Sequence, residues 1–291
     1  GTLQIGNGTT GSINNTSAIV NNGDLIFNKN EDFTIKSVTG SGNLTATTSN
    51  RFITLGGNIT QNGSVRISSS NAIGQQGIVQ SGNTTITASS INMTGSFANS
   101  PSNLLTLDTS AANGNIYLDV FNGAGGHVSG GVSAIVANAG TGNVTIGGSQ
   151  MSTNWLGRWA GSLTGAINVS STFYAGNYLN LTATANSTSS GSLILSANTT
   201  NTWTVNPNVT MTYAGVISSE GNGSITKNGT GTLLLTNANT YNGTTTVNAG
   251  TLSVTGNTSS SATTVANGGT LTGTGTVGAV TLNTGGLIGG G

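Results

Sequence analysis

The feature that most constrains this chain is a triplet, Gly followed by any residue and then an aliphatic one, that returns at a fixed step. It stands at Gly231, Gly250 and Gly269 near one end of the sequence, and at Gly23 and Gly42 near the other, so that successive triplets are nineteen positions apart. A fixed period of about 20 residues is typical of a solenoid, in which each repeat is one coil of chain that cannot bury its apolar face until neighbouring coils cover it.

The period is not uniform. We expect a further step of the same length between Gly63 and Gly82, whereas the step from Gly42 to Gly63 is longer by two, and wider gaps elsewhere predict inserted loops. A coil made of three short strands and three corners needs roughly 20 residues, and each coil stacks about 4.8 Å above the previous one.

The local sequence agrees with such a coil. Residues 232–236 and 251–254 alternate Leu or Val with Thr or Ser, as strands do when one face is buried, and the pairs Asn228-Gly229 and Asn242-Gly243 are turn signals between them. No segment has apolar residues at helical spacing. The sequence therefore predicts an all-β fold: a right-handed parallel β-helix (β-solenoid) with three short strands per coil of about 19 residues.

Two other fold classes deserve comparison. Low-complexity chains rich in Gly, Ser, Asn and Thr are often disordered, and this chain has 47 Gly and only 4% charged residues. However, Leu, Ile and Val recur every few residues, and Thr is β-branched and favours extended backbone. Tandem β-sandwiches remain an alternative, although they would lack Gly triplets at a fixed step. We expect stacked rows of Asn, Thr and aliphatic side chains instead of salt bridges.

The sequence predicts one continuous solenoid over residues 1–291, with residues 1–44 and 213–286 repeat-like and residues 45–212 less regular and interrupted by loops. The chain starts at Gly1 without a leader and ends on three glycines in mid-pattern, so we expect it to be a piece of a longer protein whose signal or anchor lies elsewhere. It has no Cys, so core burial and backbone hydrogen bonds must stabilise it. No apolar run approaches the roughly 20 residues of a membrane span.

Residues 213–286 carry an ordered series of motifs. The series reads Ala214-Gly215-Val216-Ile217-Ser218, Ile225-Thr226-Lys227-Asn228-Gly229-Thr230-Gly231-Thr232-Leu233, Asn239-Thr240-Tyr241-Asn242-Gly243-Thr244-Thr245 and Val247-Asn248-Ala249-Gly250-Thr251-Leu252. This order resembles the passenger-associated transport repeat of autotransporters, also called the autotransporter-associated β-strand repeat. Residues 1–8 and 20–28 look like the end of another copy, and residues 45–205 have a filamentous-haemagglutinin-like adhesin texture.

The resemblance implies a passenger region that lies outside the outer membrane, at the bacterial cell surface, and serves in adhesion, aggregation or display. It also implies export through a C-terminal β-barrel outside this sequence. The lack of Cys agrees with this, because a disulfide formed in the periplasm would obstruct export of an unfolded chain.

The sparse charge bears on the partners. Nucleic-acid binding depends on clustered Lys and Arg, and six scattered cations do not supply it. We expect no cofactor: the Gly-x-Gly-x-x-Gly stretches at 6–11 and 273–278 do not open helices, as a dinucleotide site requires. His127 is the only His, and without Cys it predicts no metal site. The expected partner is a host or bacterial surface glycan or protein.

One segment breaks the uniform texture. Trp155, Arg158 and Trp159 fall within five residues, and exposed aromatic residues with Arg favour interfaces. These three are the candidate ligand or partner contacts. The alternative is that both Trp side chains pack against a corner or side of the solenoid.

A second cluster holds five of the twelve charged residues: Asp24, Lys29, Glu31, Asp32 and Lys36. It is interpreted either as a polar recognition patch or as a solvated loop or edge, where charges deter association between sheets. The remaining acids are Asp108, Asp119 and Glu220. The separation of Asp108 from Asp119 is out of phase with the coil, so no catalytic carboxylate pair is predicted.

Three functions remain open. The first is a structural rod for adhesion or aggregation. The second is a spacer or self-assembling fibre without its own receptor, for which open strands at the ends of the solenoid would favour end-to-end association. The third and most remote is a polysaccharide-active β-helix enzyme. We expect no enzymatic activity.

Overall fold

The structure, a computed structural model, describes residues 1–8, 18–49, 51, 53–70, 78–80, 82–98, 104–121, 133–147, 159–170 and 172–290. Every helix or strand assigned in these ranges is a β-strand, and no helix long and apolar enough to cross a membrane occurs there. Contacts group the chain into two compact units, Gly1–Gly157 and Arg158–Gly291. The single continuous solenoid expected from the sequence stays a prediction.

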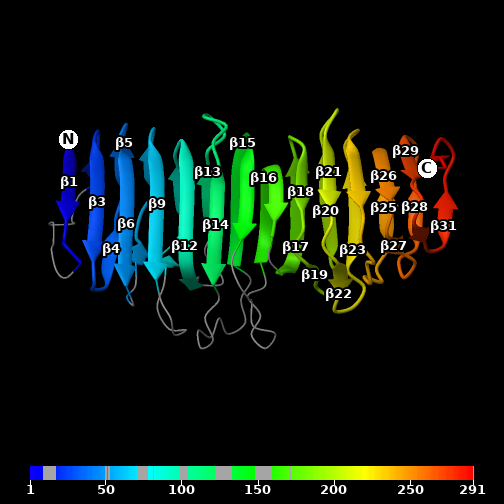
Figure 1. The fold of residues 1–291 in the computed structure, drawn as a ribbon, viewed down its shortest axis with the longest axis horizontal. Helices are drawn as coiled ribbons and strands as arrows, with labels where there is room; N and C mark the ends of the chain where they lie inside the picture. Colours follow the sequence, from blue (N-terminus) through cyan, green and yellow to red (C-terminus); the bar gives the residue numbers. More distant parts are fainter. Residues whose placement is uncertain are drawn as a thin grey trace. The chain divides into compact units, whose positions relative to one another are not determined.

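In the first unit the strands form three columns of parallel neighbours, and Figure 1 shows the strands β3, β6 and β9 of the first column side by side. The first column is β1 (Thr2–Ile5), β3 (Asp24–Lys29), β6 (Asn43–Ser49), β9 (Ser64–Ser70), β12 (Ser90–Ala98), β14 (Ile116–Phe121) and the end of β15 (Ser133–Gly147). The second is β4 (Phe33–Ile35), β7 (Ile53–Leu55), β10 (Ile78–Gln80) and the end of β12. The third is β2 (Ile19–Val20), β5 (Val38–Gly40), β8 (Ile59–Gln61), β11 (Thr84–Thr87), β13 (Leu104–Asp108) and the start of β15.

The second unit has the same plan. Its first column is β16 (Trp159–Val169), β17 (Phe173–Ala183), β20 (Thr200–Val205), β23 (Ser224–Asn228), β25 (Thr245–Val247), β28 (Thr263–Val265) and β31 (Val280–Leu282). Its second is β18 (Ser187–Ser189), β21 (Thr210–Tyr213), β24 (Thr232–Leu235), β26 (Gly250–Val254), β29 (Gly269–Thr272) and β32 (Leu287–Ile288). The third contains the start of β17, β19 (Leu193–Leu195), β22 (Ile217–Ser219), β27 (Asn257–Thr258) and β30 (Thr276–Val277).

The prediction of an all-β parallel solenoid with three short strands per coil is thus confirmed. Equivalent positions in successive coils are roughly 21 residues apart in the sequence, slightly more than predicted, because several corners carry extra residues. The right-handed sense of the coil stays a prediction, which rests on the general rule that crossovers between parallel strands are right-handed.

The core of each unit consists of inward rows of aliphatic side chains, one from each coil. Along each strand the side chains alternate between the core and the outside, as in β24, where Leu233 and Leu235 are buried and Leu234 between them is half-buried. Members of a row share one register position and touch the same position in the next coil. Two such rows are Leu25, Leu44, Val65, Ile91, Ile116 and Val144 in the first unit, and Met211, Leu233, Leu252 and Leu271 in the second.

The pairing registers test the predicted repeat directly. Leu233 pairs with Leu252 and Leu252 pairs with Leu271, so the step predicted from the Gly triplets of this region is confirmed. The step predicted from Gly63 to Gly82 is wrong, because Ser64 pairs with Ser90, well beyond Gly82. Residues after Gly82 belong to the third column instead, since a glycine followed by a strand occurs at more than one corner of a coil, and the sequence alone does not distinguish these corners.

Glycine is needed where consecutive corners meet. A Cβ atom on Gly42 would clash with the carbonyl oxygen of Gly23 in the coil above it. Gly229 and Gly250 have positive φ values of 74° and 67°, a backbone conformation that glycine adopts without strain. The Gly triplets of the sequence therefore mark places where two backbones stack in close contact.

Asn side chains join neighbouring coils at the corners, which confirms the predicted polar rows. Asn43 donates to the Asp24 carboxylate at 2.8 Å, and its own carbonyl oxygen accepts from the backbone N–H of Ser64 at 2.9 Å. In the second unit, the Asn248 amide donates to the side-chain oxygen of Asn228 at 3.0 Å. These bonds bridge coils without salt bridges.

Shortening one member of an inward row tests how much the row contributes. We expect Leu252→Ala to lower the free energy of unfolding by about 2–5 kcal/mol, because the side chain is 1% exposed and coils on both sides leave little room to collapse onto the cavity. Ser253→Ala, at an outward position of the same strand, should change it by less than about 0.5 kcal/mol. Urea unfolding followed by circular dichroism measures both, and similar losses in the two variants would contradict the assignment of inward and outward faces.

Candidate functional site

The predicted aromatic contact site falls mostly outside the described residues. Trp155 and Arg158 are not among them. Trp159 begins β16, where its backbone pairs with Ala175, and its side chain is likewise outside the description. The proposed contact surface of Trp155, Arg158 and Trp159 therefore stays a prediction.

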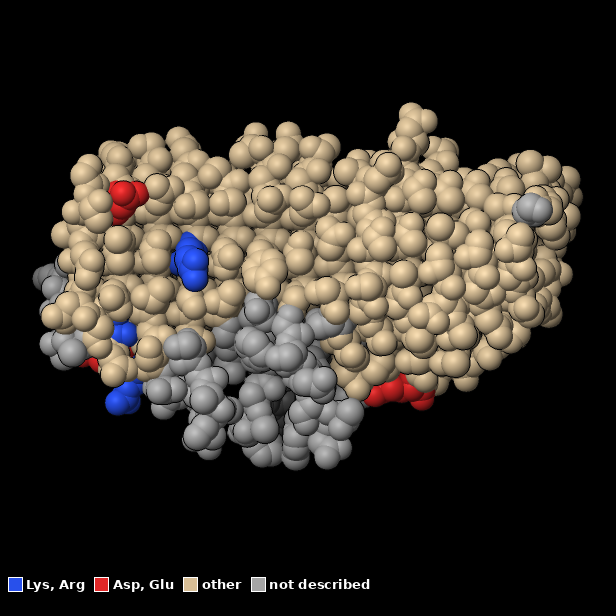
Figure 2. Space-filling model, in the orientation of Figure 1, with Lys and Arg blue, Asp and Glu red and all other residues tan. Residues whose placement is uncertain are grey.

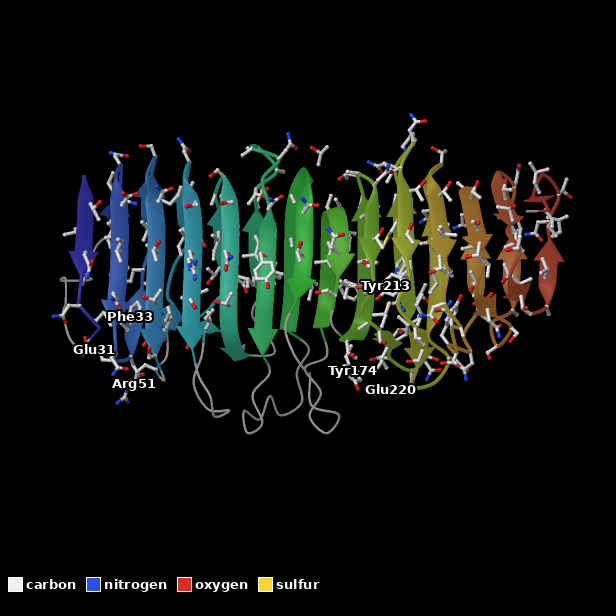
Figure 3. The ribbon with its side chains drawn as sticks, in the orientation of Figure 1. Glu31, Phe33, Arg51, Tyr174, Tyr213 and Glu220 are labelled. Carbon is white, nitrogen blue, oxygen red and sulfur yellow. The ribbon has the colours of Figure 1, made fainter. Side chains whose placement is uncertain are left out.

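The charged cluster near the N-terminal end does not form a single patch. Lys29 lies in β3 with its side chain only 8% exposed, rather than on a solvated loop. Its ammonium is 2.7 Å from the Glu31 carboxylate and 5.4 Å from the centre of the Phe33 ring, and Figure 3 shows Glu31 close to Phe33. Phe33 in turn stacks on Phe27 at a centroid distance of 5.7 Å. Lys29 thus covers an aromatic pair in the core.

Asp24 lies at a different corner, at the start of β3. Its carboxylate accepts hydrogen bonds from the side chains of Asn43 at 2.8 Å and Thr2 at 3.2 Å. These two bonds, the one from Asn43 first, lower the pKa of Asp24 below its ordinary value. The carboxylate therefore serves in the row of polar side chains that joins the first coils.

The other acids do not gather into a catalytic or metal-binding group within the described residues. Asp108 accepts two bonds from Ser110, one from the backbone N–H at 2.9 Å and one from the hydroxyl at 2.6 Å, and so fixes a turn after β13. The described residues contain no group of three His, Cys, Asp or Glu side chains that could hold a metal ion.

The most unusual side chain described in the second unit is Lys227 in β23. It occupies an inward position, paired with Trp203 in the coil before and Val247 in the coil after, and its side chain is 0% exposed. Charged side chains are rarely buried to this degree unless they are paired. Among the residues that the structure describes, no acidic side chain bonds to Lys227.

Backbone carbonyls take the place of a counter-ion. The Lys227 ammonium donates to the carbonyl oxygens of Asn228 at 2.9 Å, Gly229 at 2.7 Å and Ala249 at 3.0 Å, so all three of its donors are used. Two acceptors belong to the corner that follows β23, and the third belongs to the same corner one coil later. Burial lowers the pKa of Lys227 to about 8, because an uncharged amine is easier to keep away from water than an ammonium.

A second buried polar group links Tyr241 to the next coil. The Tyr241 hydroxyl lies 2.7 Å from the Thr245 hydroxyl, which lies 2.8 Å from that of Ser261. Ser261 then donates to the carbonyl oxygen of Gly243 at 2.7 Å. Tyr241, Thr245 and Ser261 are all at most 1% exposed, and burial is the main cause of the raised pKa of Tyr241. The chain of hydroxyls fastens the corner at Gly243 to the coil that follows.

Buried Asn side chains also fasten neighbouring coils to each other, at corners where the backbone leaves the ladder. The side-chain oxygen of Asn239 accepts from the N–H of Ile217 at 2.9 Å, and its amide donates to the carbonyl of Asn237 at 2.9 Å. Asn201 similarly accepts from the N–H of Leu179 at 2.9 Å and donates to the carbonyl of Ser224 at 3.1 Å. Each amide supplies the bonds that a missing ladder partner would have made.

Comparison with known proteins matches this region. Residues 225–254, which span β23 to β26, fit the family described as passenger-associated-transport-repeat. The chain carries a passenger-associated transport repeat. No curated protein and no solved structure is a match for the chain.

The segment that matches the transport repeat is shorter than the one predicted from the sequence. The match leaves out residues 213–224 and 255–286, and the second copy expected at residues 1–8 and 20–28 stays a prediction. Within the match, the motif includes glycines at corners, as at Gly229 and Gly250, and buried side chains, as at Lys227 and Tyr241. The repeat is therefore the sequence signature of coils that bond closely to one another.

Sequence reasoning found the glycines of the transport repeat and did not find the burial of its lysine. The signal was present, because Ile225 and Lys227 are two positions apart in a strand and must share a face. Lysine is usually exposed, so the residue type gave no indication that Lys227 is buried. The hydroxyl chain from Tyr241 was not predictable, since it depends on Ser261 from the following coil.

The lowered pKa of Lys227 predicts how stability depends on pH. Between pH 8 and about 10.5 the folded chain has released this proton while the unfolded chain still holds it, so the free energy of unfolding should rise with pH, by at most about 1.4 kcal/mol per pH unit. Urea titrations of the wild type and Lys227→Met across this range measure the effect, and the difference between them removes contributions from tyrosines. Parallel curves for the two proteins would contradict the buried ammonium.

Proposed function

We propose that this chain is a surface-exposed passenger segment of a secreted bacterial autotransporter-type adhesin, and that it acts as a structural rod for adhesion or aggregation. The observation that carries the proposal is the transport repeat, which folds as consecutive coils of a parallel β-solenoid. These two findings fit an autotransporter passenger. The association of the family with exported passengers supports the proposed placement outside the outer membrane.

The outward surface supports the role of a rod. In the second unit one outward row consists entirely of threonine: Thr202, Thr226, Thr246, Thr264 and Thr281. Figure 2 shows few charged side chains on the visible face. Hydroxyl and amide groups keep such a surface hydrated without charge, and a repeated row offers the same chemistry at every coil.

A specific ligand contact needs side chains that the coils do not repeat. The segment with Trp155, Arg158 and Trp159 is the strongest candidate by sequence, because aromatic and Arg side chains are enriched where proteins bind glycans and other proteins. We propose that this segment provides the contact with a surface glycan or protein.

Binding assays test the adhesin role. We expect the wild-type chain to bind components of a glycan array or cultured epithelial or bacterial cells, and Trp155→Ala/Trp159→Ala to lose at least about tenfold in affinity, since aromatic contact residues often contribute about 2 kcal/mol or more each. The matched control is Tyr178→Ala, an exposed aromatic residue elsewhere in the second unit, which should bind as the wild type does. No binding by the wild type would favour the spacer; equal binding by all three would place the contact elsewhere.

A second candidate function, a self-assembling fibre or spacer, is favoured by where apolar side chains are exposed. In the second unit β31 and β32 expose Leu282, Leu287 and Ile288 by 49–63%, and these strands have a parallel partner on one side only among the described residues. In the first unit Leu3 of β1 is 56% exposed. Open strands with apolar side chains are templates for pairing with another chain, and we propose end-to-end association through them.

Analytical ultracentrifugation of the 291-residue chain tests this association. We expect larger species to grow with concentration, and Leu287→Lys/Ile288→Lys to shift the weight-average mass towards that of the monomer, because two ammonium groups at the open strand oppose pairing. Tyr178→Lys adds a charge at an exposed position outside that edge and should leave association unchanged. A wild-type chain that stays monomeric at every concentration tested would rule out self-assembly through these strands.

A polysaccharide-active enzyme remains the most remote candidate. Such an activity requires carboxylates close together on one face. Among the described acids, Asp24 takes part in a row of polar side chains and Asp108 in a turn. We therefore propose a non-enzymatic role.

A further inference from the structure

The outward rows of the second unit carry almost no information about register. Thr226 pairs with Thr246, and Thr246 with Thr264, so an outward threonine meets an outward threonine in each coil. If β25 shifted by two positions along β23, Thr226 would lie opposite Thr244 or Asn248 instead. Threonine or asparagine would still face threonine, and the same side chains would still face the core.

The inward side of β23 distinguishes these registers only weakly by packing. Ile225 pairs with Thr245, and Lys227 with Val247. After a shift of two positions, Lys227 would face Thr245 or Ala249, both small enough to be accommodated. Packing alone therefore opposes the shift only weakly, and a directional interaction is needed.

Lys227 provides that interaction. Its ammonium joins the carbonyls of Asn228 and Gly229, which belong to its own coil, to the carbonyl of Ala249, which belongs to the next coil. Ala249 lies at the corner between β25 and β26, next to Gly250, which has a positive φ of 67°. The three acceptors converge on one point only when the two corners are aligned.

We propose that Lys227 fixes the register between consecutive coils of the second unit, by requiring the corner after β23 and the corner after β25 to stack. A shift of two positions moves the Ala249 carbonyl by about 6.6 Å along the strand relative to the other two acceptors. A buried ammonium that loses an acceptor carries a large desolvation penalty, so the shifted pairing is disfavoured. Buried polar groups are known to specify register in this way at some cost in stability.

Engineered disulfides read the register directly, because the chain contains no Cys. Thr226→Cys/Thr246→Cys places thiols at neighbouring positions of the observed pairing. Thr226→Cys/Thr244→Cys and Thr226→Cys/Asn248→Cys place them at positions that become neighbours only after a shift of two positions. In the observed register the Cα atoms of the last two pairs are about 8 Å apart, too far for a disulfide.

Each pair is refolded from urea with Lys227 and with Lys227→Met, oxidised, and quantified by mass spectrometry. With Lys227 we expect only the 226–246 disulfide in quantity. With Lys227→Met we expect the ratio of shifted to observed disulfides to rise at least about fivefold, since the directional bonds that remain between these coils, such as that from Asn248 to Asn228, lie at the exposed surface. An unchanged ratio in folded Lys227→Met would overturn the proposal.

Two control substitutions separate register from charge and packing. Lys36→Met removes a positive charge from an exposed position, and Val247→Ala weakens packing in the same inward row while keeping the ammonium bonds; both should keep the wild-type ratio. If Lys227→Met does not regain its β-sheet circular dichroism, Lys227→Gln takes its place. Gln has two N–H donors and cannot supply three bonds, so we expect an intermediate ratio, and a wild-type ratio there would also overturn the proposal.

Discussion

The structure of each unit depends on the parallel ladder between one coil and the next. A strand of three to six residues is too short to be stable alone, and here nearly every described strand has a neighbour in the coil before and in the coil after it. This arrangement demands that most inward positions hold an apolar side chain in one coil after another. It also demands that corners stack closely, which is why Gly42 lies against the Gly23 carbonyl with no room for a Cβ atom. The repeat in the sequence is the consequence of both demands.

The near absence of charge follows from the same geometry. Like charges at one register position would lie about 4.8 Å apart along a column, and their repulsion would be repeated at every coil. Asn, Thr and Ser avoid this because each can donate to one neighbour and accept from the other, as Asn43 does between Asp24 and Ser64. Lys227 is compatible with burial only because three carbonyls at the corners accept hydrogen bonds from its ammonium. The burial of Lys29 is made compatible in a different way, by one carboxylate and one aromatic ring beside its ammonium.

Much of this architecture was predictable from residues that recur in phase. The Gly triplets at 231, 250 and 269 predicted the correct register, because there each coil has the same length and no inserted residues. The glycines at 63 and 82 predicted a wrong step, because one coil has three corners and a glycine is compatible with any of them. The candidate site was less predictable. Tyr241 bonds with a residue of the following coil, and contacts of that kind depend on coil length, which a single sequence does not fix. Lys29 was expected at the surface and the burial of Lys227 was not predicted, although the alternation of the strands places both side chains inside.

The regularity that stabilises the coils also limits where specific recognition can occur. An outward row such as Thr202 to Thr281 presents one hydroxyl at every coil, so a ligand bound at one coil would find an equivalent position at the next. Such a row gives extension and hydration, and it cannot by itself define a single binding position. A unique position requires residues that break the repeat, and the sequence places aromatic side chains and an arginine together only around Trp155, Arg158 and Trp159. Repeated rows and single binding positions therefore place different demands on the sequence: the rows need the same side chain in every coil, and a binding position needs side chains that occur once.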